Sequence, residues 1–339
     1  MPFSPKCRLP SAVEFIFIFV LASFAISIQT GCSSIGVKRV DRQEWILENT
    51  DTALTTGNIS RRVRDYMALH GIDGAFDDEP GAVLVKLAKI FRKTEDNETL
   101  DALIELCFYH AENSSGEERT SAHLSAAYYA YISLFQGLPG LPPDSPYEPR
   151  YLFNCRFYDH SVAGFLLDLQ NSGISFDKPF ELPLVDGRIV KFSQAISTLP
   201  LPLSDYETFL NCFGYMPEGL NTYSRRAGLG APLIPVRKQF PADDLKEEGS
   251  SLGGMFPATL FIRFAQPFSM EGSPEAVMEF HDTTKDEFVD VGDKKVPLEL
   301  DISTPFAYFL RNRPVIVRGI YYLLNPGEEL AGIVHAHPI

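Results

Sequence analysis

The chain has 339 residues, 45% of them hydrophobic, which is enough for the core of one large domain or of two ordinary ones. Its formal net charge is −14 at pH 7. Because such a surface repels phosphate backbones, we expect no nucleic-acid partner.

The first 31 residues follow the order of a secretory signal. Lys6 and Arg8 precede an apolar run over residues 15–28, and small and polar residues follow. The run is shorter than the roughly 20 residues that a membrane-spanning helix needs. We therefore predict that residues 1–31 are a signal peptide that takes no part in the fold.

The sequence Gly31-Cys32-Ser33-Ser34 resembles a bacterial lipobox, whose cysteine is diacylated and becomes the new N-terminus. Gln29 departs from this pattern, which usually has Leu, Val or Ile three positions before the cysteine. The alternatives are an ordinary cleaved signal and an uncleaved anchor. We predict lipidation at Cys32 and a membrane-anchored protein of the cell envelope that faces the periplasm or the exterior.

Residues 32–172 are predicted to form a helical section. Ser60 has the character of a helix N-cap, Gly71 ends that helix, and Pro80 fits the first turn of the next one. Apolar stripes at helical spacing predict further helices around residues 100–108, 121–135 and 150–171. Gly173 ends the last of them.

Residues 173–339 are predicted to be β-rich with one short helix. Asp186-Gly187 lies between two apolar runs and indicates a hairpin. Further strands are expected over residues 258–264, 276–282, 287–300 and 314–324, and a helix capped by Thr304-Pro305. The predicted fold is α+β, a helical N-terminal half packed with a mainly antiparallel C-terminal half.

The sequence Gly249-Ser250-Ser251-Leu252-Gly253 fits G-x-S-x-G, the turn that carries the nucleophile of serine hydrolases. That turn needs a buried strand before it and a helix after it. Here a charged stretch, residues 241–248, precedes it, and Gly254 and Pro257 disfavour a following helix. We predict that Ser251 is not a nucleophile.

The histidines suggest no catalytic triad. His70, His110 and His160 lie near predicted helix ends, where capping explains them. His335 and His337 could offer two imidazoles to a metal, but they belong to the last five residues, which favours a frayed tail. We predict no catalytic residue, no metal ligand and no cofactor.

The cysteines outside the N-terminal region are Cys107, Cys155 and Cys212, an odd number at wide spacing. This pattern indicates neither a disulfide framework nor a metal site. Cys107 and Cys155 have apolar and aromatic neighbours, so we expect buried, inert thiols.

Arg225 and Arg226 precede Gly228 and Gly230 in a distinctive stretch. Two guanidinium groups beside flexible glycines are a candidate anion-binding site. The alternative is a tight turn whose arginines pair with carboxylates of the same chain, and the acidic composition favours it.

Several stretches together resemble the N-terminal region of bacterial lipoprotein-type α/β-hydrolases of the esterase or lipase kind. They begin at Gly31-Cys32 and continue with Asn49, Ala53, Leu54, Gly57 and Ser60. They go on with LCFYHAE, AAYYAYISLF, YEPRYLFNCRFYDHSVA and YSRRAGLGAPL. Each is short, but they are spread over most of the chain.

The resemblance implies an accessory section followed by a catalytic domain, with its elbow serine and later Asp and His beyond Ile339. No catalytic residue of the family is therefore carried over. Three hypotheses follow: a non-catalytic scaffold or binding module with a possible hydrolase-like partner domain, a fragment of a serine esterase whose catalytic domain lies downstream, or an enzyme of other chemistry.

Overall fold

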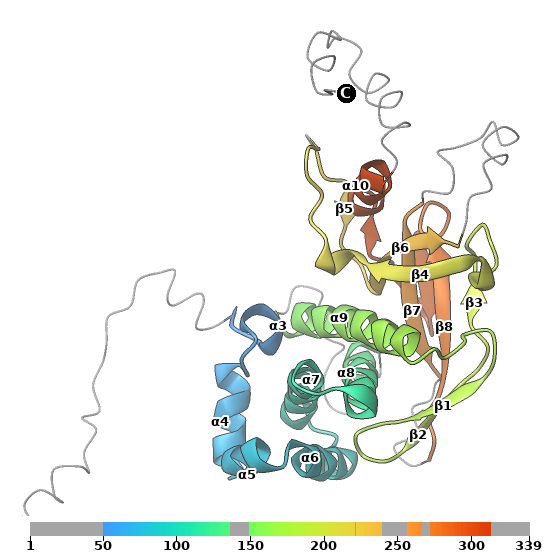
Figure 1. Ribbon diagram of the computed structural model, residues 1–339. Coiled ribbons are helices and arrows are strands. Elements are labelled where there is room, and N and C mark those ends of the chain that lie inside the picture. Colours follow the sequence, from blue (N-terminus) through green and yellow to red (C-terminus); the bar gives the residue numbers. More distant parts are fainter. Residues whose placement is uncertain (1–49, 136–148, 221, 239–255, 266–271, 313–339) are drawn as a thin grey trace, which may run out of the picture. The chain divides into compact units, whose positions relative to one another are not determined.

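The computed structural model of the protein describes residues 50–135, 149–220, 222–238, 256–265 and 272–312 (Figure 1). All of these residues belong to one compact unit, Asn49–Ile339. Helices come first and strands follow, so the predicted α+β class is confirmed, with a helical N-terminal half and a mainly antiparallel C-terminal half.

The helical half of the described chain is built from two short helices and five longer ones. They are α3 (Ala53–Thr56), α4 (Arg61–Leu69), α5 (Asp73–Asp78), α6 (Pro80–Thr94), α7 (Asn97–Glu112), α8 (Gly116–Phe135) and α9 (Pro149–Asn171).

Local signals set several helix ends as predicted. The Ser60 hydroxyl accepts a hydrogen bond from the Val63 N–H at 3.3 Å and begins α4. Pro80 is the first residue of α6, where the helix needs no N–H donor. Gly71 and Gly173, shortly after α4 and α9, have positive φ angles of 60° and 68°, which glycine adopts without a steric penalty.

Helix α3 is held to α7 by one buried carboxylate. Glu105 accepts hydrogen bonds from the backbone N–H groups of Ala53 and Ser60, at 2.9 Å and 2.6 Å. It also accepts one from the Ser60 hydroxyl at 2.7 Å. Because these donors satisfy a group that burial would otherwise penalise, they fix the start of the described chain against the helical core.

Seven strands form the main sheet in the order β1-β2-β8-β7-β6-β4, and β3 pairs with β8 off this path. Only the β2–β8 and β3–β8 pairs are parallel. The strands are β1 (Phe180–Pro183), β2 (Ile189–Phe192), β3 (Ile196–Ser197), β4 (Tyr206–Asn211), β6 (Ala231–Arg237), β7 (Ala258–Phe264) and β8 (Glu275–Asp282).

The hairpin at Asp186-Gly187 is confirmed, and Gly187 has a φ of 83°. Strand β6 was not predicted, because Gly228, Gly230 and two prolines, Pro232 and Pro235, indicate a loop. The strand forms nonetheless, pairing with β7 through Ala231–Leu233 and with β4 along most of its length.

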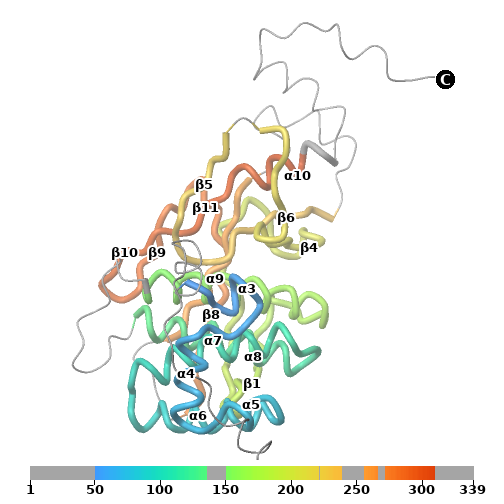
Figure 2. Tube along the Cα trace, turned by 90° about the vertical axis from the view of Figure 1, so that its left-hand side faces the viewer, coloured from blue at the N-terminus to red at the C-terminus, as the bar shows by residue number. Residues whose placement is uncertain are grey.

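Two smaller sheets complete the described part of the chain (Figure 2). Strands β9 (Phe288–Val291) and β10 (Lys294–Pro297) form the expected hairpin at Gly292. Strand β5 (Arg225–Arg226) pairs with β11 (Leu300–Asp301). Helix α10 (Ser303–Asn312) follows β11. It begins one residue before Thr304, so the predicted cap at Thr304 is wrong. The Asp301 side chain accepts a hydrogen bond from the Thr304 N–H instead. The strand predicted over 314–324 lies outside the described residues.

Aromatic rings join α8 and α9 to the sheet. The ring centroids of Tyr131 on α8 and Phe264 on β7 are 5.3 Å apart. Those of Tyr158 on α9 and Phe261 on β7 are 5.7 Å apart. All four side chains are buried, so this aromatic layer ties the two halves into one core.

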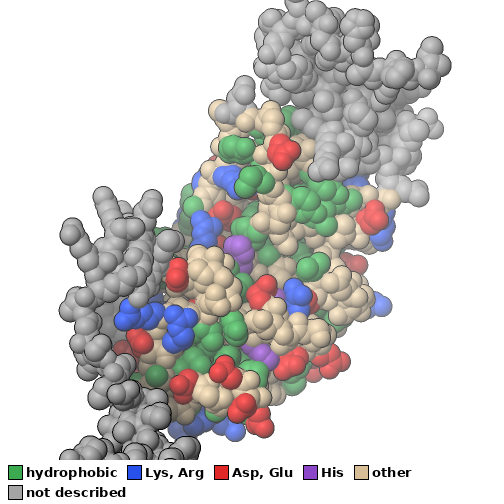
Figure 3. Space-filling model, turned by 60° about the vertical axis from the view of Figure 1, so that its left-hand side comes forward, with side chains coloured by type: hydrophobic (Ala, Val, Ile, Leu, Met, Phe, Trp, Pro, Cys, Tyr) green, Lys and Arg blue, Asp and Glu red, His purple; other side chains and the backbone are tan. Residues whose placement is uncertain are grey.

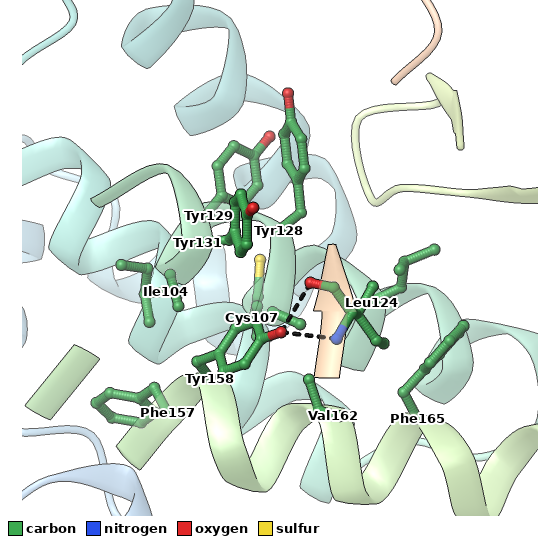
Figure 4. Packing of buried hydrophobic residues seen from close by; sticks show 14 of the residues in the cluster. Ile104, Cys107, Leu124, Tyr128, Tyr129, Tyr131, Phe157, Tyr158, Val162 and Phe165 are labelled. Atoms are coloured by element: carbon green, nitrogen blue, oxygen red, sulfur yellow. Dashed lines mark hydrogen bonds between the residues drawn. The ribbon is translucent and has the colours of Figure 1, made fainter. Parts of the chain in front are cut away.

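Tyr158 also makes polar contact with the sheet (Figure 4). Its hydroxyl donates to the Ile262 carbonyl at 2.7 Å and accepts from the Ile262 N–H at 2.8 Å. The antiparallel pairing of β6 with β7 stops at the Ala231–Leu260 pair, so Ile262 has no partner residue in β6. The tyrosine hydroxyl thus takes the place of a strand neighbour.

Candidate functional site

A pocket of about 400 Å³ lies where the end of α7 and the middle of α9 meet α3, the end of β4 and the short helix η2 (Cys212–Gly214). This size falls within the range of about 300–1,000 Å³ that is typical of small-molecule sites. On the face drawn in Figure 3, hydrophobic side chains reach the surface between charged side chains of both signs. The pocket is therefore the candidate functional site.

The pocket wall combines apolar and aromatic side chains with polar ones. Leu54 comes from α3, Phe108 from α7, Leu167 from α9 and Phe213 from η2. The ring of His160, also on the wall, stacks on Phe213 with centroids 4.0 Å apart and an angle of 13° between the planes. Burial, with a further contribution from Arg156, lowers the pKa of His160 to about 4. This imidazole is therefore neutral at pH 7.

Arg119, at the N-terminal part of α8, supplies the cation of the pocket wall. Its Nε lies 3.1 Å from Oδ1 of Asp168 on α9. Burial raises the pKa of Asp168 to about 6. The positive charge of Arg119 acts to lower this pKa, and the negative charge of Glu112 acts to raise it. At pH 7 the Asp168 carboxylate is largely ionised, so it neutralises Arg119.

His123 lies behind this wall and is fully buried. Its Nε2 is 3.5 Å from Oε1 of Glu112 and 4.0 Å from Oδ2 of Asp168. Neither ring nitrogen has a hydrogen-bond partner within the described residues. Burial, followed by the charge of Arg119, lowers the pKa of His123 to about 3.

The low pKa means that loss of hydration outweighs the two nearby carboxylates, so His123 is neutral at pH 7. An imidazole that protonates only near pH 3 is a weak general base at neutral pH. The described residues that line the pocket also include no serine, cysteine or lysine.

Within the described residues, no three His, Cys, Asp or Glu side chains lie together in an arrangement that could hold a metal ion. The cysteines of this part of the chain, Cys107, Cys155 and Cys212, are free thiols. Burial raises the pKa of all three, that of Cys155 to about 12. Cys107 is buried as predicted, whereas Cys155 is only partly buried. The inertness of these thiols stays a prediction.

Arg225 and Arg226, the predicted anion-binding candidates, form β5 and are not among the residues that line the pocket. Arg225 Nε is 2.8 Å from Asp301 Oδ2. Arg226 Nη1 is 3.6 Å from Glu287 Oε1. Each guanidinium group already faces a carboxylate, as the alternative interpretation expects, and the anion site stays a prediction.

The glycines beside these arginines are packed closely. A Cβ at Gly228 would lie 2.2 Å from the Leu298 carbonyl carbon, and one at Gly230 would lie 2.7 Å from the Leu260 carbonyl oxygen. The Gly228 N–H donates to Glu299 at 2.7 Å, and the Gly230 N–H donates to Asp159 at the same distance. The contacts explain why this stretch needs glycine.

The other residues discussed from the sequence are distributed as follows. Cys32, Ser251, His335 and His337 lie outside the described residues. His70 and His110 are at the ends of α4 and α7, as predicted. The expectation for His160 is wrong, because α9 continues for eleven residues past it to Asn171 and the ring stacks in the pocket.

Sequence reasoning did not single out Glu112, Arg119, His123 or Asp168. Arg119 and His123 are four residues apart on α8, which places them on one face of that helix. This spacing in the sequence indicates two polar side chains on one side of a helix. Nothing in the sequence connects them to Asp168, which lies 45 residues further along on α9.

The fold and the pocket define an α+β protein with a ligand-sized site, which is lined by its helices and by the end of β4 and η2. A comparison with known proteins finds no protein-family model, no curated protein and no solved structure that matches this chain. No helix of the described residues is both long and apolar enough to cross a membrane.

Proposed function

We propose that this protein is a non-catalytic binding module that is exported and lipid-anchored at Cys32 in the cell envelope. The observation that carries the binding role is the pocket between α3, α7, α9 and η2, whose wall combines aromatic and apolar side chains with Glu112, Arg119, His160 and Asn211. Small-molecule sites join apolar and aromatic side chains with a small number of polar groups that orient the ligand. The N-terminal order of Lys6, Arg8, an apolar run and Cys32 supports export.

A hydrolase-like domain is the proposed partner, and it rests on the sequence resemblance to lipoprotein-type α/β-hydrolases. In this proposal the lipid anchor keeps the module at the membrane surface. The pocket then takes up a small molecule there.

Saturation-transfer NMR of the full chain with indole tests the pocket. We expect a transfer signal that is greatly reduced in Leu167→Trp, because Leu167 lines the pocket and a larger side chain there narrows it. Leu152→Trp is the matched control, since Leu152 is an exposed leucine of the same helix that is not among the lining residues.

Equal signals in Leu167→Trp and in the wild-type protein would place indole elsewhere and contradict the proposal. The circular dichroism of both variants should match the wild type, because Leu167 and Leu152 are 39% and 55% exposed and neither supports the core.

A further inference from the structure

The charges around the pocket do not cancel. Asp168 neutralises Arg119, and His123 and His160 are uncharged at pH 7. Glu112 remains, with its side chain 51% exposed. No Lys or Arg in the described part of the chain lies within ion-pair distance of its carboxylate, and the neutral His123 lies 3.5 Å from it.

The position of Glu112 adds a second source of negative potential to its own charge. Glu112 is the last residue of α7. The carbonyl groups at a helix C-terminus carry partial negative charge, so a carboxylate there is repelled and a cation is attracted. A cation in the pocket would therefore meet both the Glu112 carboxylate and the negative end of α7.

The apolar wall next to Glu112 is aromatic. Phe108 and Tyr109 precede Glu112 on the last turns of α7, and Phe213 lines the pocket from η2. Aromatic faces bind both flat apolar bodies and organic cations. A bound carboxylate, in contrast, would compete with Asp168 for Arg119 and would face Glu112.

We propose that the pocket binds a ligand that carries a primary ammonium group on an apolar body of about the size of one ring. The ammonium group pairs with the Glu112 carboxylate at the end of α7, and the body lies between the aromatic side chains. The inference rests on the proposed function and adds the chemical class of the ligand.

Isothermal titration calorimetry of the full chain at pH 7.5 tests this class with three compounds of similar size. They are 2-phenylethylamine, 2-phenylethanol and 3-phenylpropionate, which are cationic, neutral and anionic. We expect the amine to bind at least about tenfold more tightly than the alcohol, as for one charge-assisted hydrogen bond, and the acid most weakly.

The Glu112→Gln variant should remove the advantage of the amine while leaving the affinity for the alcohol unchanged. Glu98→Gln is the matched control, because Glu98 is in the first turn of the same helix, away from the pocket. That variant should keep the wild-type order. Phenylalanine as a fourth compound distinguishes a free amine from an amino acid as the source of the ammonium group.

Tighter binding of the acid, equal binding of the amine and the alcohol, or an undiminished preference in Glu112→Gln would each overturn the ligand class while leaving the pocket as a binding site. Absence of binding for all compounds, together with no transfer signal from indole, would overturn the ligand class and the proposed function together.

Discussion

At the scale of single residues, the contact between Gly164 and His123 is the tightest feature of the site. A Cβ on Gly164 would lie 2.5 Å from Cε1 of His123. His123 is fully buried and cannot move into solvent. The absence of a side chain at position 164 therefore allows α9 to approach α8 at a residue that lines the pocket.

Replacing Gly164 with alanine should destabilise the fold by about 1–3 kcal/mol, the range measured for overpacked cores. The free energy of unfolding from urea titration measures the effect. Gly81→Ala, in the first turn of α6, is the control, because a Cβ there meets no atom within 4 Å. We expect that change to be neutral or to stabilise by less than about 1 kcal/mol. Equal effects at the two positions would rule out the steric contact as the cause.

The buried imidazole of His123 should make stability fall in mild acid. Its folded-state pKa is lowered to about 3 from 6.5, so the unfolded chain binds a proton that the folded chain does not. Stability is complete above pH 6.5 and is lost as the pH falls toward 3. At pH 5 the loss is about 2 kcal/mol, at about 1.4 kcal/mol per pH unit.

Urea titrations of the wild type and of His123→Gln at pH 7 and pH 5 measure this loss, and the wild type should lose about 2 kcal/mol more than the variant. The charged groups facing His123 are Glu112 on α7, Arg119 on α8 and Asp168 on α9. The raised pKa of Asp168, about 6, favours the folded state below pH 6, and this opposite trend is present in both proteins. Parallel losses in the two proteins would mean that His123 is already charged when folded.

At the scale of elements, α9 connects the two halves. It packs on α8, forms one wall of the pocket and contacts β4, β6 and β7. Gln170 near its end reaches the sheet as well, accepting from the Phe209 N–H at 2.7 Å and donating to the Phe209 carbonyl at 3.0 Å. Helix α9 is thus one of the links between the pocket and the sheet, beside Asn211 at the end of β4, which lines the pocket directly.

The Tyr158→Phe variant should lose about 2 kcal/mol of stability or more, because it leaves both the N–H and the carbonyl of Ile262 without their tyrosine partner in a buried place. The ring is kept, so the packing against Phe261 does not change. The midpoint of urea unfolding is the readout. Tyr109→Phe is the control, since Tyr109 is only partly buried and its hydroxyl makes no hydrogen bond within the described residues. If the two variants unfold alike, the hydrogen bonds of Tyr158 contribute little.

At the scale of the whole molecule, much of the fold could be predicted from the sequence. The helices around Ser60, Pro80 and Gly173 have strong local signals, and the Asp186-Gly187 hairpin has one too. No strand was predicted at β4. A second exception is β6, whose proline and glycine content indicates a loop. Its partners β4 and β7, which lie far away in the chain, decide its conformation instead.

The pocket could not be predicted in the same way. It requires the end of α7 and residues of α3, α9 and η2 to meet, and no local pattern encodes that meeting. The unusual pKa values of His123 and Asp168 come from burial, which depends on the complete fold. Composition and spacing identified Arg225 and Arg226 instead, and both proved to face carboxylates.

The predicted anchor can be tested on the full chain in bacterial cells. Cys32→Ser should abolish the incorporation of an alkyne-labelled fatty acid, because the acyl groups of a lipoprotein are attached through that cysteine. Cys7→Ser is the control, since Cys7 precedes the apolar run within the predicted signal peptide. Labelling that persists in Cys32→Ser would contradict a lipid anchor at this position.

The hydroxyl of Tyr158 has one more consequence, for self-association. A strand edge with open N–H and carbonyl groups is a template onto which another chain can add a strand. At Ile262 the N–H and the carbonyl group both form hydrogen bonds with the Tyr158 hydroxyl, on the edge of β7 that the pairing with β6 does not reach. A tyrosine anchored in α9 therefore protects this stretch of β7 from pairing with a second molecule, and its loss would expose a site for aggregation as well as weaken the fold.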